Sequence, residues 1–175
     1  MTAVAVVVAG LAAPQVLKAM KRAVLADAIN NAKQVKLTLD SFATDFDGQY
    51  PSEKTGKFVI EGGTGSTYSN DYFRQMFLSG GVESEKIFWV KNSACAAKGA
   101  PDDKVKEGGR VQADLVLEEG DCHWAYITDQ TNLDTGSRPL ILDGYKRGTS
   151  EWDPNTWDQT VIVMTIDGTC RLMRM

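Results

Sequence analysis

The chain has 175 residues, of which 43% are hydrophobic and 24% are charged, so it is long enough for one folded domain, or for one domain with an appendage. Its 19 basic and 23 acidic residues give a net charge of −4. Because binding to phosphates needs a clustered basic surface, this balance argues against a nucleic-acid partner.

Residues 1–13 carry no charged side chain and are almost wholly apolar. The run is too short to span a bilayer, which needs about 20 residues. Three interpretations remain open: a signal-peptide core that lacks its usual basic flank, a buried core helix, or the remnant of a longer apolar helix. Lys18, Lys21 and Arg22 follow the run, so a secreted head would require basic residues upstream of Met1. The charge pattern therefore favours the remnant.

An amphipathic helix is predicted from Pro14 to about residue 47. Its apolar side chains recur every three or four residues and form one stripe: Val24, Ala28, Ala32, Val35, Leu39, Phe42 and Phe46. Gly48 and Tyr50-Pro51 stop the helix. Together with the apolar run it makes about 45 residues, or roughly 70 Å, which is more than a small head can bury. We therefore divide the chain into an apolar membrane or assembly segment, residues 1–25, and a globular head, residues 26–175.

The remaining chain predicts one short helix and several strands. Residues 52–68 are rich in glycine and are expected to form a loop, and a helix is expected over 70–80. Strands are expected over 85–91, 122–128, 138–143, 160–166 and 169–175. Asp167-Gly168 between the last two runs is a strong hairpin signal. The sequence thus predicts an α+β fold in which a long N-terminal helix packs on an antiparallel sheet.

Several of these segments resemble type IV pilin-like proteins and the pseudopilins of type II secretion systems. The apolar VAVVVAGLAAPQ is similar to the second half of their shared N-terminal helix, and NAKQVKLTLDSFATDFDGQYP is similar to the end of that helix and its turn. The head segments EKIFWVKNS, GDCHWAYI, RPLILDG and VIVMTIDGTCRL resemble one bacterial subgroup. The family's cleavage signal and its nearby glutamate are absent. They would lie upstream of Met1, so the chain is expected to be truncated or to have a start codon placed too late.

The resemblance implies a non-enzymatic structural subunit of a pilus or pilus-like filament that polymerises through its N-terminal helix. The residues expected to carry assembly are Val4, Val7, Val8, Leu11, Pro14 and Leu17. The expected partners are copies of the chain or related pilins, with the inner membrane holding the subunit before assembly. The head would lie outside the cytoplasm, in the periplasm or at the cell surface. A secretion pseudopilin and a membrane-anchored monomeric binding module are the alternatives.

The three cysteines do not have the spacing of a zinc site, since there is no CxxC pair and only one histidine. In a secreted head, a Cys95–Cys122 disulfide would tether the long loop between them and leave Cys170 free. A Cys122–Cys170 bridge and three reduced, buried thiols are the alternatives. Cys122 and His123 are not expected to act as a nucleophile and its base, because neighbours on a strand point to opposite faces.

The loop before the last hairpin offers four hard oxygen donors of the kind that calcium prefers: Glu151, Asp153, Asn155 and Asp158. Some secretion pseudopilins bind calcium in a late loop. The spacing here matches no fixed motif, however, so no cofactor is predicted, and calcium is kept only as an alternative to solvated acidic side chains.

Overall fold

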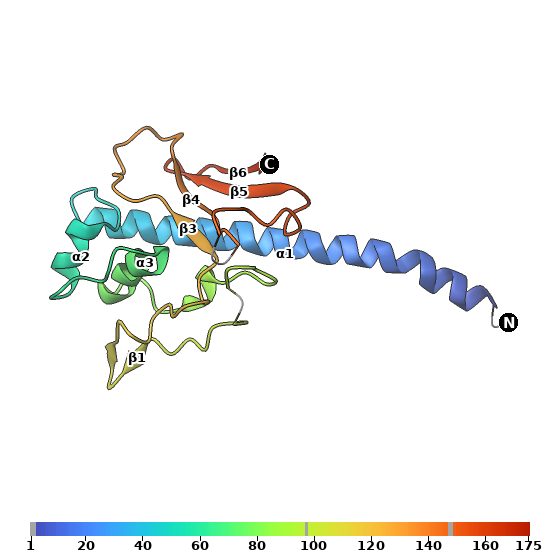
Figure 1. Ribbon diagram of the computed structural model, residues 1–175, viewed down its shortest axis with the longest axis horizontal. Helices are drawn as coiled ribbons and strands as arrows, with labels where there is room; N and C mark the ends of the chain where they lie inside the picture. Colours follow the sequence, from blue (N-terminus) through green and yellow to red (C-terminus); the bar gives the residue numbers. More distant parts are fainter. Residues whose placement is uncertain (1–2, 97, 147–148) are drawn as a thin grey trace.

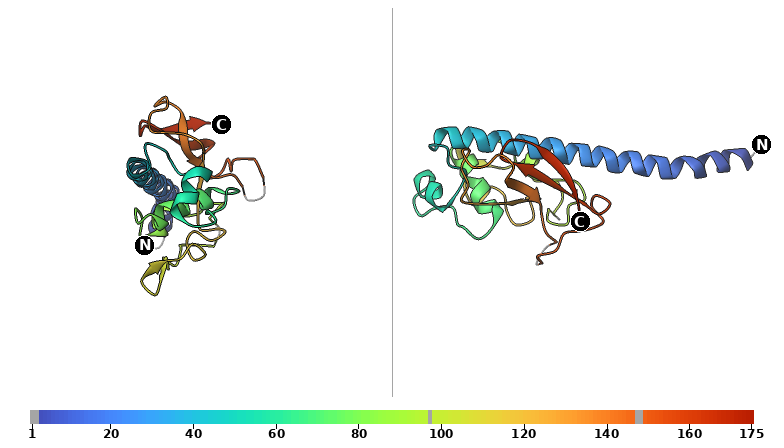
Figure 2. Two further views of the ribbon diagram at one scale, coloured as in Figure 1. Left: turned by 90° about the vertical axis from the view of Figure 1, so that its left-hand side faces the viewer. Right: turned by 90° about the horizontal axis from the view of Figure 1, so that it is seen from above.

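The computed structural model describes residues 3–96, 98–146 and 149–175, with side chains from Gln15 onward. The fold is α+β: one long helix, α1 (Ala3–Asp45), carries a small head that packs along its C-terminal part (Figures 1 and 2). The other elements are α2 (Glu53–Val59), α3 (Ser69–Leu78), the 3-10 helix η1 (Glu85–Phe88), β1 (Lys106–Glu107), β2 (Arg110–Val111), β3 (Trp124–Tyr126), β4 (Pro139–Asp143), β5 (Thr160–Thr165) and β6 (Cys170–Arg174).

The predicted apolar stripe of α1 is confirmed within the head. Five of its members are buried, namely Ala28, Ala32, Val35, Leu39 and Phe42, while Val24 and Phe46 are partly buried at its two ends. The helix stops at Gly48 as expected, because this glycine adopts φ +80° and its amide donates to the carbonyl of Ala43 (2.7 Å).

Four strands form one antiparallel sheet in the order β3-β4-β5-β6. The predicted hairpin at Asp167-Gly168 joins β5 to β6, and Asp167 Oδ1 accepts hydrogen bonds from the Thr165 hydroxyl (2.5 Å) and the Thr169 amide (2.9 Å). Ile162 and Met164 are fully buried on β5, whereas β6 lies at the edge of the sheet and most of its side chains are exposed. The free edge of the sheet on that side is therefore β6.

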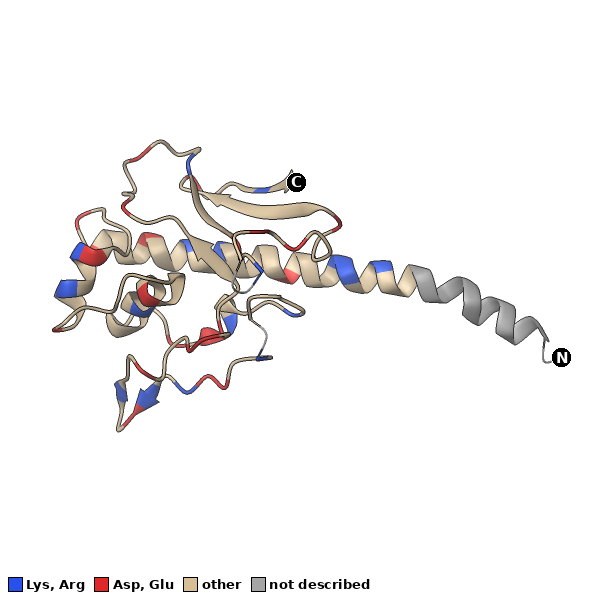
Figure 3. Cartoon of the chain, viewed as in Figure 1, with Lys and Arg blue, Asp and Glu red and all other residues tan. Residues whose placement is uncertain are grey.

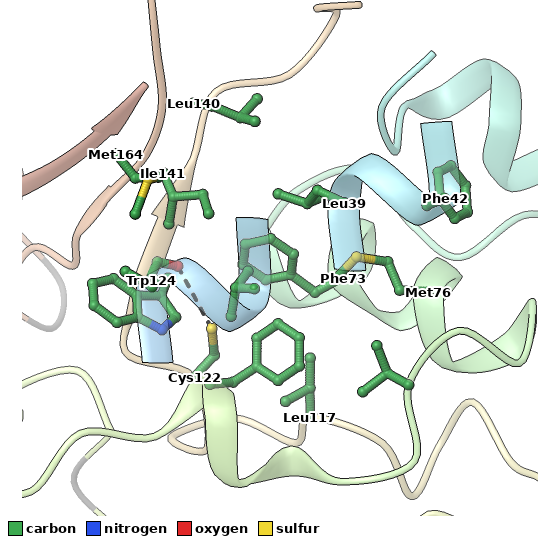
Figure 4. Packing of buried hydrophobic residues seen from close by; sticks show 14 of the residues in the cluster. Leu39, Phe42, Phe73, Met76, Leu117, Cys122, Trp124, Leu140, Ile141 and Met164 are labelled. Atoms are coloured by element: carbon green, nitrogen blue, oxygen red, sulfur yellow. Dashed lines mark hydrogen bonds between the residues drawn. The ribbon is translucent and has the colours of Figure 1, made fainter. Parts of the chain in front are cut away.

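The core lies between α1, the sheet and the shorter helices. Figure 4 shows Leu39 and Phe42 of α1 near Phe73 and Met76 of α3, with Trp124, Leu140, Ile141 and Met164 contributed by the sheet. Phe73 packs against Phe88 with ring centroids 5.1 Å apart. The stripe of α1 therefore serves as one wall of the core for about half the length of the helix.

Two local predictions were wrong. Residues 85–91 were expected to form a strand, but η1 is a 3-10 helix with Ser84 at its N-cap, and the Asp103 carboxylate accepts the Glu85 amide (2.7 Å). Residues 53–59 were expected to lie in a loop, but they form α2, which begins with a reciprocal hydrogen-bonded cap between Ser52 and Thr55. In both places side-chain caps decide the backbone conformation.

Candidate functional site

The part of α1 that leaves the head is exposed where its side chains are described. All side chains from Gln15 to Ala23 are exposed, and we call this stretch the neck. Val16, Leu17 and Met20 are 55%, 63% and 54% exposed. Among the predicted assembly residues, only Leu17 lies where side chains are described; the side chains of Val4, Val7, Val8, Leu11 and Pro14 lie outside the described residues. The neck therefore presents apolar side chains of which more than half the surface is exposed to solvent.

The neck is also basic. Lys18, Lys21 and Arg22 are exposed on it, and Figure 3 shows these charges on α1 just before the head. Lys21 Nζ lies 3.2 Å from Asp158 of the loop before β5, and both side chains are mostly exposed. An ion pair between exposed side chains contributes little to stability, about 0–1 kcal/mol. The described part of the neck is thus held mainly by the continuity of the helix.

A groove of about 460 Å³ lies where the neck meets the head. Its apolar lining residues are Leu17, Met20 and Val24 of α1 and Trp157 of the loop before β5. The remaining lining residues are polar or charged: Lys21, Lys91, Asn92, Asp153, Asn155 and Thr156. A lining that combines apolar and polar side chains is found at surfaces that receive a protein partner.

A buried relay links the only histidine to a serine and an aspartate. Ser93 Oγ lies 2.6 Å from His123 Nδ1, and His123 Nε2 lies 2.7 Å from Asp143 Oδ1. Ser93 Oγ also accepts the amides of Cys95 (3.1 Å) and Ala96 (3.0 Å), so its proton is available to the histidine. These connections follow the order of a hydrolase triad.

The surroundings of this relay indicate a structural role. All three side chains are buried, and the neighbouring cavity holds only about 10 Å³, which is close to the space of a single water. The carboxylate of Asp143 accepts two further donors, Trp157 Nε1 (3.1 Å) and the amide of Ile162. The hydrogen bonds of the relay therefore connect four segments of the head. They join the loop after η1 and the residue that precedes β3 to β4 and β5.

The sequence did not reveal this relay, because its members lie far apart along the chain. Ser93, His123 and Asp143 belong to three different segments, and only the fold brings them together. The one signal was that His123 is unique, and its partners could not be read from spacing. Cys122 and His123 have different partners: the Cys122 thiol donates to the carbonyl of Trp124 (3.6 Å), and the His123 ring contacts Ser93 and Asp143.

Cys95, Cys122 and Cys170 are free thiols in the structure. Cys95 and Cys122 line one open hollow of about 1050 Å³, and Cys95 Sγ donates to the carbonyl of Tyr145 (2.6 Å). Burial raises the pKa of the Cys95 thiol to about 11 and that of the Cys122 thiol to about 12. The Cys95–Cys122 disulfide stays a prediction, and the shared hollow shows that these two thiols lie on the same side of the head.

The acidic loop does not bring its carboxylates together. Glu151 lies 3.6 Å from Lys146, and Asp158 lies by Lys21, while Asp153 accepts the amide of Asn155 (3.0 Å). Within residues 3–96, 98–146 and 149–175 there is no group of three Asp, Glu, His or Cys side chains placed to hold a metal ion. This arrangement gives calcium no support beyond the composition of the loop.

No helix in the described part of the chain is both long enough and apolar enough to cross a membrane. No family model, no curated protein and no solved structure matches this chain. The exposed neck and its groove are therefore the candidate functional site on the strength of their own geometry.

Proposed function

We propose that the chain is a structural subunit of a type IV pilus or a pilus-like filament, and that it polymerises through its N-terminal helix. The observation that carries this proposal is the neck: one continuous helix serves as a core wall inside the head and then leaves it with Val16, Leu17 and Met20 exposed. A helix that only closed the core would have no reason to continue past Val24 with apolar side chains.

The energetics favour association through this helix in water. Burying one large apolar side chain is worth about 1.5–3 kcal/mol relative to leaving it exposed. Where neighbouring copies bury them, Leu17 and Met20 together with the apolar positions of residues 3–13 therefore supply a drive for self-association that opposes its entropic cost. In a membrane, lipid tails would meet the same side chains and remove most of this drive, so a bilayer can store the subunit before assembly.

The two alternatives make different use of the neck. A pseudopilin of a secretion system would assemble through the same helix into a short periplasmic filament. A monomeric binding module would need the helix only as an anchor, whose apolar side chains meet lipid, and it would not require the apolar stripe to run on continuously into the head. No catalytic activity is proposed, since the serine–histidine–aspartate relay is buried and lacks room for a substrate.

The test compares two leucines on the same helix. Leu17 is 63% exposed on the neck, and Leu37 is 69% exposed beside the head. The full chain is purified in detergent and transferred to buffer without detergent, and assembly is followed by sedimentation and by negative-stain electron microscopy. Leu17→Asp is expected to abolish filaments, because it places a charge in a dry helix bundle, whereas Leu37→Asp should assemble as the parent chain does.

Equal assembly of both variants would overturn the proposal that the neck is the assembly surface. A parent chain that remains monomeric in buffer without detergent would overturn the filament proposal as a whole and favour the anchored binding module. Near-ultraviolet circular dichroism of both variants checks that the head is folded, which is expected because both positions are exposed.

A further inference from the structure

The most exposed aromatic side chain of the described residues lies at the opposite end of the molecule from the neck. Phe58 on α2 is 82% exposed, and α2 lies beside the C-terminal end of α1, far from the N-terminus (Figure 1). The inner side of α2 is fixed to the head, because the Thr55 hydroxyl donates to Gln75 Oε1 (2.7 Å). Phe58 is therefore a rigidly mounted apolar side chain that points into solvent.

The groove at the neck is a partly apolar hollow that no described residue fills. Its volume of about 460 Å³ lies in the range of about 300–1,000 Å³ that holds drug-sized groups, so it can accept an aromatic ring. Leu17, Met20, Val24 and Trp157 supply the apolar contacts for such a ring. The exposed side chain of Phe58, which we call the knob, and the open groove at the neck thus lie at the two ends of one molecule.

The charges at the two ends are complementary. Lys18, Lys21 and Arg22 make the neck basic. At the far end, the exposed charged residues of segment 45–61 are four acids and two lysines: Asp45, Asp47, Glu53, Glu61, Lys54 and Lys57. Opposite potentials on facing surfaces orient two proteins before they touch and disfavour the contact of two like ends.

We propose that Phe58 of one copy docks in the neck groove of the next copy, with the acidic far end of the first facing the basic neck of the second. This inference rests on the proposed filament function and adds the head contact between successive subunits. Because the contact joins two different surfaces, it is heterologous, and it leaves a free knob at one end and a free groove at the other. Such a contact builds an open filament when the rotation between copies does not close a ring.

Photo-crosslinking tests the contact directly. In the full chain, Phe58 is replaced by p-benzoyl-phenylalanine, which keeps an aromatic group at an exposed position, and the assembled material is irradiated. Cross-linked dimers are expected, and mass spectrometry should locate the attachment within residues 16–24 or 152–157. The same replacement at Tyr68, which is 70% exposed and lines a separate hollow, should give no cross-link to the neck.

A pair of serine variants measures the strength of the contact. Phe58→Ser should raise the critical concentration for assembly by about tenfold or more, since it removes one large apolar side chain from the interface, while Tyr68→Ser should leave it within about twofold. Filaments that form without a cross-link from position 58 to the neck, or with an unchanged critical concentration in Phe58→Ser, would overturn this contact but leave the filament function standing. A parent chain that forms no assembly would overturn both.

Discussion

Asp143 illustrates how a single buried side chain organises the head. Its carboxylate receives donors from His123, Trp157 and the backbone of β5, and all of them are withdrawn from water. Removing a buried acceptor that has several partners lowers the free energy of unfolding by more than the contribution of any one of its hydrogen bonds. The reason is that each donor left behind stays buried without a hydrogen-bond partner.

Asp143→Asn is therefore expected to lower the free energy of unfolding by about 2–4 kcal/mol, since the new amide turns a donor toward other donors. Urea unfolding followed by tryptophan fluorescence measures the change. Asp27→Asn on the exposed side of α1 is the matched control and should change stability by no more than about 0.5 kcal/mol. Equal transition midpoints for the two variants would contradict a structural role for the relay.

Because its thiols are buried, we expect the reduced protein to lose free energy of unfolding at alkaline pH. Burial raises the pKa of Cys122 to about 12, above its value in the unfolded chain, so the unfolded chain releases this proton first. The stability linked to the protonated thiol is complete below the unfolded pKa and is lost as pH rises, by at most about 1.4 kcal/mol per pH unit for this group.

Urea midpoints of the reduced chain should therefore fall between pH 8.5 and 10, and they should fall less in Cys122→Ala, which has no proton to release there. The same series on the oxidised chain examines the predicted disulfide. A Cys95–Cys122 bridge would remove the titration and raise the midpoint. Parallel curves for reduced parent and Cys122→Ala would show that Cys122 does not titrate as its burial requires.

Among the elements, those with a strong periodic or turn signal could be predicted from the sequence. The stripe of α1 and the Asp167-Gly168 hairpin are local patterns, and the structure shows both. The 3-10 helix η1 and α2 could not be predicted, because their conformations depend on caps: Asp103 reaches Glu85 from a distant segment, and the short Ser52–Thr55 cap lies in a glycine-rich stretch.

The site divides in the same way. The apolar and basic character of the neck could be predicted, because it follows directly from the order of residues along one helix. Neither its groove nor the relay could be predicted, because Trp157 and Met20 come to line one groove, and Ser93 comes to contact His123, only after the chain has folded. Long-range pairs of this kind leave no periodic signal in a single sequence.

At the scale of the whole molecule, the exposure of the neck predicts that the head is independent of it. Side chains from Gln15 to Ala23 are exposed, and the first fully buried position on α1 is Ala28. Deletion of residues 1–20 should therefore leave a monomeric head with native near-ultraviolet circular dichroism and nearly the stability of the parent.

Deletion of residues 1–32 is the control and should unfold the head. It removes Ala28 and Ala32 from the core, and it removes the Asn31 amide that donates to the carbonyl of Trp89 (3.0 Å). Loss of the near-ultraviolet signal in the shorter deletion as well would mean that the neck is part of the folding unit, against the division at about residue 25.

The exposed edge strand β6 affects whether filaments of these subunits can associate side by side. An exposed edge strand is a template for pairing with another sheet, and such lateral fusion turns threads into aggregates. In an antiparallel pairing of two β6 strands centred between Leu172 and Met173, Arg171 of one copy faces Arg174 of the other, and both are exposed. Directly opposed like charges destabilise such a pair. If the subunits assemble as proposed, these opposed arginines therefore disfavour the lateral fusion of two filaments through this pairing of their edge strands.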